Sequence, residues 1–273
     1  MSRRLANAGE IDGSAPIAIV GAACRLPGAP DLAGFARLLD EGRDAVTEVP
    51  ADRFTQARFL HPRPGEVGRA LHFRAGTIGD VAGFDATGFG LSPREADEMD
   101  PQQRLLLMLA RRAFEDAGWP EAQAAGRRIG VYVGASTTDY ADIRQQDNGS
   151  ADRYIMTGGA LSIAANRLGH VFDLRGPAMT LDTACSSGLV ALNAACEALR
   201  AGQATAAVVG GVNLLLSPYP FLGFWRAGML SKRGRCQAFG AGGRTAMCAP
   251  RAAWCCCSSP SPMRGATATA SAA

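Results

Sequence analysis

The chain has 273 residues, which corresponds to one large domain or two modest ones and is long enough to bury a substantial core. It is 47% hydrophobic and 19% charged, with 33 glycines and 15 prolines, and this composition excludes a disordered chain, a collagen and a coiled coil. Residues 243–273 carry three arginines and no Asp, Glu or Lys, so the other 25 basic residues balance the 25 acidic ones. Residues 1–242, the body of the chain, therefore carry no net charge. They give no electrostatic reason to expect nucleic acid or a membrane surface as a partner.

The first predicted elements are a strand and a long helix. Residues 16–21 form a short run with β-branched side chains closed by glycine, which is typical of a buried strand. Asp100 and Pro101 then supply a helix N-cap and a proline at the first helical position, and Gly118 supplies a stop signal. The sequence between them predicts a helix.

The following segments alternate strands with a helix. Leucine and alanine recur at helical spacing from Leu189 to Leu199, and Gly202 ends the run, so we expect a helix over 185–201. Strands are expected at 129–134, 178–183 and 205–210. The order strand, helix, strand predicts a βαβ crossover and an α/β fold built on a mostly parallel sheet.

The longest uncharged run, residues 204–225, is long enough to span a bilayer. Glycines and prolines within it would interrupt a membrane helix, so we expect a buried strand followed by a loop. The chain opens on Met1-Ser-Arg-Arg and a polar stretch rather than on an apolar signal segment. Four scattered cysteines in the body are typical of a reducing compartment, and we expect a cytoplasmic protein.

Cys185 is the sharpest candidate for chemistry, in the segment Leu181-Asp-Thr-Ala-Cys-Ser-Ser-Gly188. A thiol at a strand-to-helix turn faces the unpaired N–H groups at the helix start, which favour the thiolate. The small neighbours leave room for a substrate, and the Cys185 backbone N–H could donate to an oxyanion. On spacing alone the alternative stays open, since most lone cysteines are buried and inert.

The same segment carries a resemblance to a known family. Asp182-Thr-Ala-Cys-Ser-Ser-Gly-Leu-Val-Ala-Leu192 closely resembles the active-site segment of β-ketoacyl synthases, specifically of the ketosynthase domains of modular (type I) polyketide synthases. Over residues 14–242, further stretches resemble the same family in the same order: Ile17-Ala-Ile-Val-Gly21, Cys24-Arg-Leu-Pro-Gly28, Leu91-Ser-Pro-Arg-Glu-Ala96, Met99-Asp-Pro-Gln-Gln-Arg104, Ala165-Asn-Arg-Leu168, Phe172-Asp-Leu-Arg-Gly-Pro177, Gly210-Gly-Val-Asn-Leu214 and Arg226-Ala-Gly-Met-Leu-Ser231.

The resemblance implies the N-terminal half of a thiolase-like α/β fold, homodimeric in this family. It implies that Cys185 takes an acyl chain from the phosphopantetheine of an acyl carrier protein, with its own N–H as one oxyanion donor. The carbanion that forms when malonyl-carrier protein loses CO₂ then attacks the acyl-cysteine. No bound cofactor and no metal are implied, and the expected partners are the carrier protein and a second copy of the chain.

The chain departs from the family at its histidines. The resemblance implies two histidines that promote decarboxylation, and a supporting lysine, in motifs downstream of the matched region. Only His61, His72 and His170 are present, and none lies in such a motif. We expect His170 to be structural and His61 and His72 to be surface residues. The adjacent cysteines 255–257 lack the spacing of a zinc site.

Residues 243–273 differ abruptly in composition from the rest. In a shifted reading frame, each new codon takes the third base of one codon and the first two bases of the next. The codons of Met247–Cys248 and Trp254–Cys255 must then each give Val, and those of Cys255–Cys256 and Cys256–Cys257 must each give Leu. With permitted choices elsewhere, the shifted frame resembles the next ketosynthase segment. We therefore divide the chain into an N-terminal extension (1–13), a β-ketoacyl synthase N-terminal region (14–242) and an out-of-frame, disordered tail (243–273).

Two functions follow from these observations. The first is a ketosynthase of polyketide or fatty acid biosynthesis, an acyltransferase that is expected to be inactive alone without the downstream histidines. The second is a non-catalytic ketosynthase fragment or gene remnant. A chain-length factor would also be non-catalytic, but such proteins lack the cysteine found here at position 185.

Overall fold

The computed structural model describes residues 16–63, 66–146, 153–236 and 253–259, and for the last range only the course of the backbone. The strands are β1 (Ala18–Arg25), β2 (Val46–Glu48), β3 (Arg74–Gly76), β4 (Ile129–Gly134), β5 (Ala178–Leu181), β6 (Ala206–Val212) and β7 (Ala253–Ser259). The helices are α1 (Leu32–Asp40), α2 (Pro93–Glu98), α3 (Pro101–Asp116), α4 (Glu121–Ala124), α5 (Asp139–Arg144), α6 (Ile155–Gly159), α7 (Leu161–Val171), α8 (Ser187–Arg200) and α9 (Tyr219–Arg226). The described residues also form the 3₁₀ turns η1 (Gln56–Arg58), η2 (Thr87–Phe89) and η4 (Ala184–Ser186).

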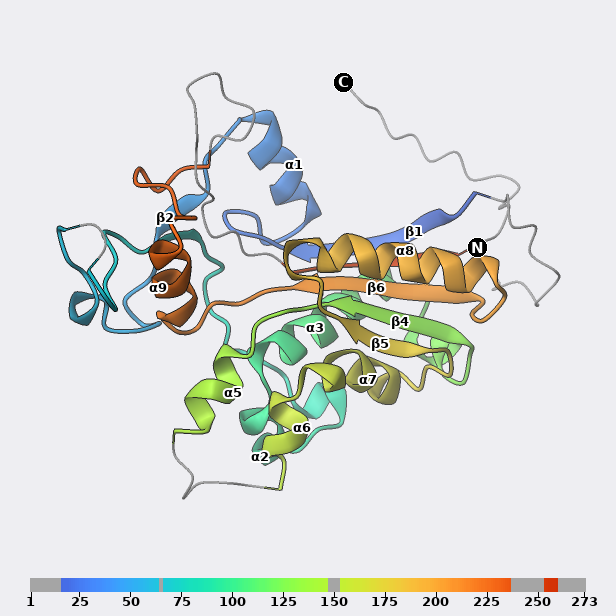
Figure 1. Ribbon diagram of the computed structural model, residues 1–273. Coiled ribbons are helices and arrows are strands. Elements are labelled where there is room, and N and C mark those ends of the chain that lie inside the picture. Colours follow the sequence, from blue (N-terminus) through green and yellow to red (C-terminus); the bar gives the residue numbers. More distant parts are fainter. Residues whose placement is uncertain (1–15, 64–65, 147–152, 237–252, 260–273) are drawn as a thin grey trace.

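The central sheet has the strand order β1-β7-β6-β4-β5. β4 pairs in parallel with β5 on one side and β6 on the other, with Val131 opposite Ala178 and Val208. The chain passes from β5 through α8 to β6, which confirms the predicted βαβ crossover and the mostly parallel sheet. Because β4, β5 and β6 run in the same direction, their carboxyl ends meet at one edge, on the left in Figure 1.

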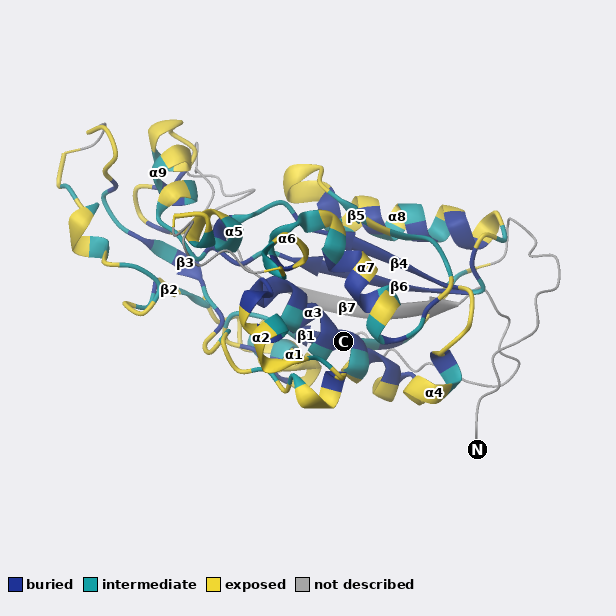
Figure 2. Cartoon of the chain, turned by 90° about the horizontal axis from the view of Figure 1, so that it is seen from below, coloured by how far each residue is buried: buried dark blue, intermediate teal, exposed yellow. Residues whose placement is uncertain are grey.

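Helices cover both faces of this sheet. Figure 1 shows α8 on one face and α3 and α7 on the other. Ile129, Val131 and Val133 of β4 pack into the core with α3 and α7, whereas Tyr132 packs into the core with α8. Since successive side chains point to opposite faces, a strand covered on both sides reads as an unbroken apolar run. Figure 2 shows the buried residues gathered in these strands and in the helix faces against them.

The helix α3 confirms the expectation for residues 100–118. The Asp100 side chain accepts a hydrogen bond from the Gln102 N–H at 2.7 Å, and Pro101 occupies the first helical turn. Gly118 follows the last turn with φ of 67°, in the left-handed region that glycine adopts without strain. The leucines of this helix are buried in the core shared with β4 and α7.

A smaller lobe lies beyond the carboxyl edge of the sheet (Figure 1). Its antiparallel pair β2 and β3 and the helix α9 enclose a separate core that contains Phe73 and Phe221, whose ring centroids are 5.4 Å apart. The uncharged run at 204–225 therefore holds β6 and most of α9, where we expected a strand and a loop. Pro220 fits because it lies in the first turn of α9, where its missing N–H has no intrahelical partner to lose. In the described part of the chain, every helix is too short or too polar to cross a bilayer.

The prediction of a disordered tail is wrong for residues 253–259. They form β7, which pairs antiparallel with β1 through Ala18–Arg25 and with β6 through Ala207–Val212. These pairings are made by backbone N–H and C=O groups. The side-chain composition of the segment, which favoured disorder, therefore does not prevent them. Residues 243–252 and 260–273 lie outside the described residues.

Candidate active site

Cys185 lies at the carboxyl edge of the sheet, between β5 and α8. β5 ends at Leu181, the turn η4 carries Cys185, and α8 begins at Ser187. Ala184 has φ of 54°, a left-handed conformation that costs a non-glycine residue about 1 kcal/mol. The Cys185 side chain is exposed, so its thiol is accessible from solvent. The predicted helix over 185–201 is thus confirmed, with its first residues in the 3₁₀ turn.

Side chains of the turn itself hold it in this strained shape. Asp182 Oδ1 accepts a hydrogen bond from the Ala184 N–H at 2.9 Å. Ser187 Oγ accepts from the Thr183 N–H at 2.9 Å and donates to the Ala184 carbonyl at 2.7 Å. Both the N–H and the carbonyl of Ala184, just before Cys185, are therefore hydrogen-bonded. These hydrogen bonds compensate for the strain at Ala184.

The start of α8 supplies the electrostatics of the site. Cys185 lies in the turn that leads into this 14-residue helix, whose first N–H groups carry the positive end of the helix dipole. The Cys185 backbone N–H has no acceptor within the described residues. It can therefore donate to the oxyanion of a tetrahedral intermediate formed on its own side chain.

Gly134 allows β4 to end directly against this helix. A Cβ atom on Gly134 would lie 2.5 Å from the Gly188 nitrogen and 2.5 Å from the Ser187 carbonyl carbon, far inside van der Waals contact. Only a residue without a side chain permits this approach. The end of β4 thereby sets the position of the first turn of α8.

Polar residues after β4 and β6 complete the edge. Ser136 follows β4, and its Oγ lies 3.3 Å from Ser187 Oγ and 3.5 Å from the Ala184 carbonyl oxygen. Thr137 follows Ser136 and contacts Asn213, which follows β6, at 2.9 Å between Oγ1 and Oδ1. These residues were not among the candidates predicted from the sequence. Their position in the sequence could have predicted them, because residues that directly follow parallel strands lie at the edge of the sheet where α/β proteins bind ligands.

None of the three histidines has a described contact with the Cys185 turn. His72 is half-buried rather than a surface residue, since its Nε2 lies 3.0 Å from the Ser231 carbonyl oxygen and its ring packs edge-on against Trp225. His61 is half-buried, with Nδ1 3.2 Å from the Arg63 nitrogen. Both belong to the small lobe.

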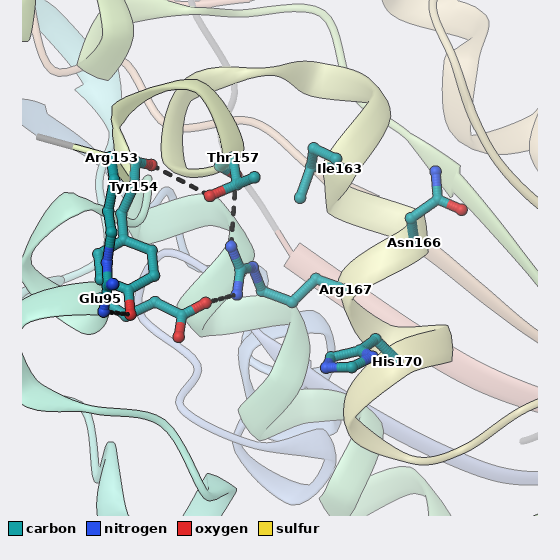
Figure 3. Close-up of a pocket in the computed structure, with 8 residues that line it drawn as sticks. All are labelled: Glu95, Arg153, Tyr154, Thr157, Ile163, Asn166, Arg167 and His170. Carbon is teal, nitrogen blue, oxygen red and sulfur yellow. Dashed lines mark hydrogen bonds and ion pairs between the residues drawn. The ribbon is translucent and has the colours of Figure 1, made fainter.

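His170 is exposed and lines a cavity of about 590 Å³ between α2, α6 and α7 (Figure 3). The expectation that His170 is structural stays a prediction. Arg167, 6% exposed, lies beside it and pairs with Glu95 at 2.7 Å and with Gln103 Oε1 at 2.6 Å. These partners satisfy the buried guanidinium, so the cavity wall is held together by structural contacts.

The other described cysteines differ from Cys185 in exposure or position. Cys24 is buried in β1, and burial, with a smaller contribution from Asp31, raises the pKa of its thiol. Cys196 is half-buried in α8, and Cys236 is exposed near the end of the small lobe. Within the described ranges, no group of three potential ligands could hold a metal ion. Cys185 is thus the described cysteine that combines exposure with a helix start.

The sequence and the fold both match characterised proteins. Residues 14–249 match the family described as "Beta-ketoacyl synthase, N-terminal domain". Over 227 residues the chain is 45% identical to highly reducing polyketide synthase 17 of Metarhizium anisopliae, covering 82% of this chain and 7% of that protein. It is 49% identical over 225 residues to fumosorinone synthetase of Cordyceps fumosorosea, covering 81% and 5% respectively.

Solved ketosynthases superimpose on most of the chain. The oxazolomycin ketosynthase domain OzmH KS7 of Streptomyces albus JA3453 has a TM-score of 0.84 and 39% identity, covering 90% of this chain and 42% of that one. The ketosynthase from module 6 of the bacillaene synthase of Bacillus subtilis 168 has a TM-score of 0.77 and 33% identity, covering 89% and 40%. The predicted thiolase-like α/β fold is confirmed, and the chain spans about two fifths of the length of these structures.

Proposed function

Because this chain belongs to the β-ketoacyl synthase family, we propose that it is a polyketide ketosynthase region whose Cys185 accepts acyl groups from an acyl carrier protein. The observation that carries this proposal is the exposed thiol at the strand-to-helix turn, at the start of α8 and with its own N–H lacking an acceptor in the described residues. A soft thiolate suits the task, since it attacks a thioester and later leaves again.

The acyl transfer can be written with the residues of this site. The Cys185 thiolate attacks the thioester carbonyl, and the carbonyl oxygen becomes an oxyanion that the Cys185 N–H and the positive end of α8 stabilise. As the tetrahedral intermediate collapses, the bond to the phosphopantetheine sulfur breaks. The products are acyl-Cys185 and the carrier thiolate, which takes a proton from water.

The condensation step needs more than this site provides. Decarboxylation of malonyl-carrier protein develops negative charge on an enolate, and losing one donor to such a charge typically costs about 10²–10³ in rate. His61 and His72 lie in the small lobe, and His170 lines the cavity by α7. We therefore propose that the chain alone performs acylation and no condensation. A non-catalytic fragment is the second candidate, favoured by this separation of every histidine from the Cys185 turn.

An intact-mass measurement tests the proposal. The full chain is incubated with acyl-carrier protein, and we expect a mass increase of one acyl group that Cys185→Ala abolishes and Cys236→Ala leaves in place. With malonyl-carrier protein added, we expect no β-ketoacyl product. Absence of acylation would favour the non-catalytic fragment, and product formation that depends on Cys185 would show that the histidines are dispensable.

We further propose a homodimer through β5. The sheet order leaves β5 at an edge, and edge strands present unpaired backbone groups that can pair with another chain. Met179 of β5 and Leu189 of α8, the helix that follows β5, are both exposed large apolar residues. Analytical ultracentrifugation of the full chain would test this proposal, with a monomer mass as the contrary result. The cytoplasmic location remains a prediction from the sequence.

A further inference from the structure

One buried amide joins the start of α3 to the loops after β4 and β6. Gln102 is 4% exposed, and its Nε2 donates to the Thr137 carbonyl at 2.9 Å and to Asp100 Oδ2 at 3.2 Å. Its Oε1 accepts from the Leu214 N–H at 3.1 Å and lies 3.2 Å from Thr137 Oγ1. The two ends of this side chain therefore hold two loops that are far apart in the sequence.

The contacts continue from Thr137 to the nucleophile. Ser136 precedes Thr137, and its Oγ touches both Ser187 Oγ and the Ala184 carbonyl oxygen. Those two groups close the turn in which Ala184 is strained and Cys185 is exposed. A displacement of the Thr137 backbone would shift Ser136 and change the support of this turn.

We propose that Gln102 is a positioning residue for acyl transfer to Cys185, acting through Thr137 and Ser136; this inference rests on the proposed function. Without the amide, the Thr137 carbonyl and the Leu214 N–H would each lose this partner in a buried place, and the loops would move to replace it. In the tetrahedral intermediate, the Cys185 Sγ is bonded to the former carbonyl carbon while the Cys185 N–H donates to its oxygen. Small errors in that geometry reduce the rate of acylation strongly.

The next residue along α3 provides a matched control. Gln103 is 2% exposed and also uses both ends of its amide, donating to the Gly158 carbonyl at 2.8 Å and accepting from Arg167 Nε at 2.6 Å. Its partners lie in α6 and α7, away from the Cys185 turn. Substitution by leucine should therefore disturb the core to a similar extent at either position, and the site only at Gln102.

Two reactions of the Cys185 thiol distinguish a positioning role of Gln102 from a general loss of folded structure. Acylation by a hexanoyl N-acetylcysteamine thioester requires stabilisation of an oxyanion, whereas alkylation by iodoacetamide requires only an accessible thiolate. Both rates are measured by peptide mass spectrometry at Cys185, with the exposed Cys236 as internal reference. The full chain is used in wild-type form and as Gln102→Leu, Gln103→Leu and Thr137→Val.

We expect Gln102→Leu to lower acylation of Cys185 about tenfold while alkylation changes less than about threefold. Gln103→Leu should change neither rate by more than about threefold, although both variants lose thermal stability. If Gln102→Leu does not fold, Thr137→Val removes one hydroxyl from the same chain of contacts with little change in shape and should show the same selective loss. Equal losses in the Gln102 and Gln103 variants, or unchanged acylation in Gln102→Leu, would overturn the positioning role.

The wild-type protein distinguishes the two levels of the proposal. If its Cys185 is acylated no faster than Cys236, the proposed function fails, and the positioning role fails with it. If wild-type Cys185 is acylated selectively but the Gln102 variant retains that selectivity, the function stands and only the positioning role is wrong.

Discussion

Asp100 is a buried carboxyl group at the start of α3, 4% exposed, and it caps that helix by accepting from the Gln102 N–H. Burial raises its pKa from the ordinary value of 3.8 to about 6, against the opposing effect of the hydrogen bonds from Gln102. The positive charge of Arg104 lowers the pKa and the nearby Asp139 carboxyl raises it by smaller amounts. The protonated form is therefore favoured in the folded protein relative to the unfolded chain.

This shift makes the folding free energy depend on pH. Because the folded state binds the proton more tightly, the stabilising contribution is complete below about pH 4 and is lost as the pH rises through about 6. Asp100→Asn should remove that slope, since asparagine also caps helices but does not titrate. Between pH 4 and 7, we expect the free energy of unfolding of the wild type to fall by up to roughly 3 kcal/mol relative to that of this variant. Urea unfolding of both proteins measures the difference, and parallel pH profiles would contradict the assignment.

At the residue scale, the sequence predicted Cys185 as a candidate nucleophile but did not predict the side chains that lie around its turn. Cys185 was found because its neighbours in the chain carry the signal: a strand end, small residues and a helix start. Ser136 contacts the turn, and Gln102 contacts Thr137 beside it, only in the folded sheet, because these partners are far apart in the sequence. These contacts therefore leave no local pattern in the sequence. The histidines show the same limit, since the exposed position of His170 and the packing of His72 against Trp225 depend on tertiary structure.

At the scale of elements, the contact between β4 and α8 depends on the glycine at the end of β4. Gly134→Ala would place a methyl group 2.5 Å from the Gly188 nitrogen, so the first turn of α8 must move away. We expect a loss of about 1–3 kcal/mol in the free energy of unfolding, as for other overpacked sites, together with slower acylation of Cys185. Chemical denaturation and peptide-resolved acylation measure the two effects.

Gly223 in α9 is the matched control for that substitution. No heavy atom lies within 4 Å of the Cβ position there, and the residue is in an exposed helical position. Gly223→Ala should raise stability by about 0.5–1 kcal/mol, because alanine loses less conformational entropy than glycine in a helix. A Gly134→Ala protein as stable and as reactive as Gly223→Ala would show that the close approach has no role.

Elements with strong local signals were predicted well, and those without them were not. β4 and α3 carry an apolar run and a capped amphipathic pattern, and both occur at the expected residues. α9 was missed because Pro218 and Pro220 favoured a loop, whereas tertiary packing of Phe221 against Phe73 places a helix there. The strand β7 was missed because it pairs with β1 and β6, whose residues lie more than 40 positions earlier in the sequence.

At the scale of the whole molecule, β7 bears on the origin of residues 243–273. The shifted reading frame must encode Val, Leu and Leu across the codons of Trp254 to Cys257, and these codons lie within β7. Its neighbour β6 is buried throughout, and a strand in such a place is typically a run of Val, Ile and Leu. We propose that the segment is translated out of frame and still pairs in the sheet through its backbone.

The coding DNA tests the frame proposal directly. We expect sequencing across codons 236–250 to reveal an insertion or deletion, after which the shifted frame continues through codons 244–264 as an open, apolar-rich segment. A stop codon in that shifted frame, or choices of codon that make it strongly polar, would contradict the proposal.

The central claim is that the fold makes Cys185 an acyl acceptor, and the most direct measurement compares it with Cys236 in the same molecules. Both thiols are exposed, but only Cys185 lies at the start of a helix packed against the sheet. The full chain is treated with an acyl thioester of a carrier protein, and the two acylation rates are followed by peptide mass spectrometry. We expect the rate at Cys185 to exceed that at Cys236 by at least about 10²-fold, the effect of a preorganised oxyanion donor. Equal rates at the two cysteines would contradict the account.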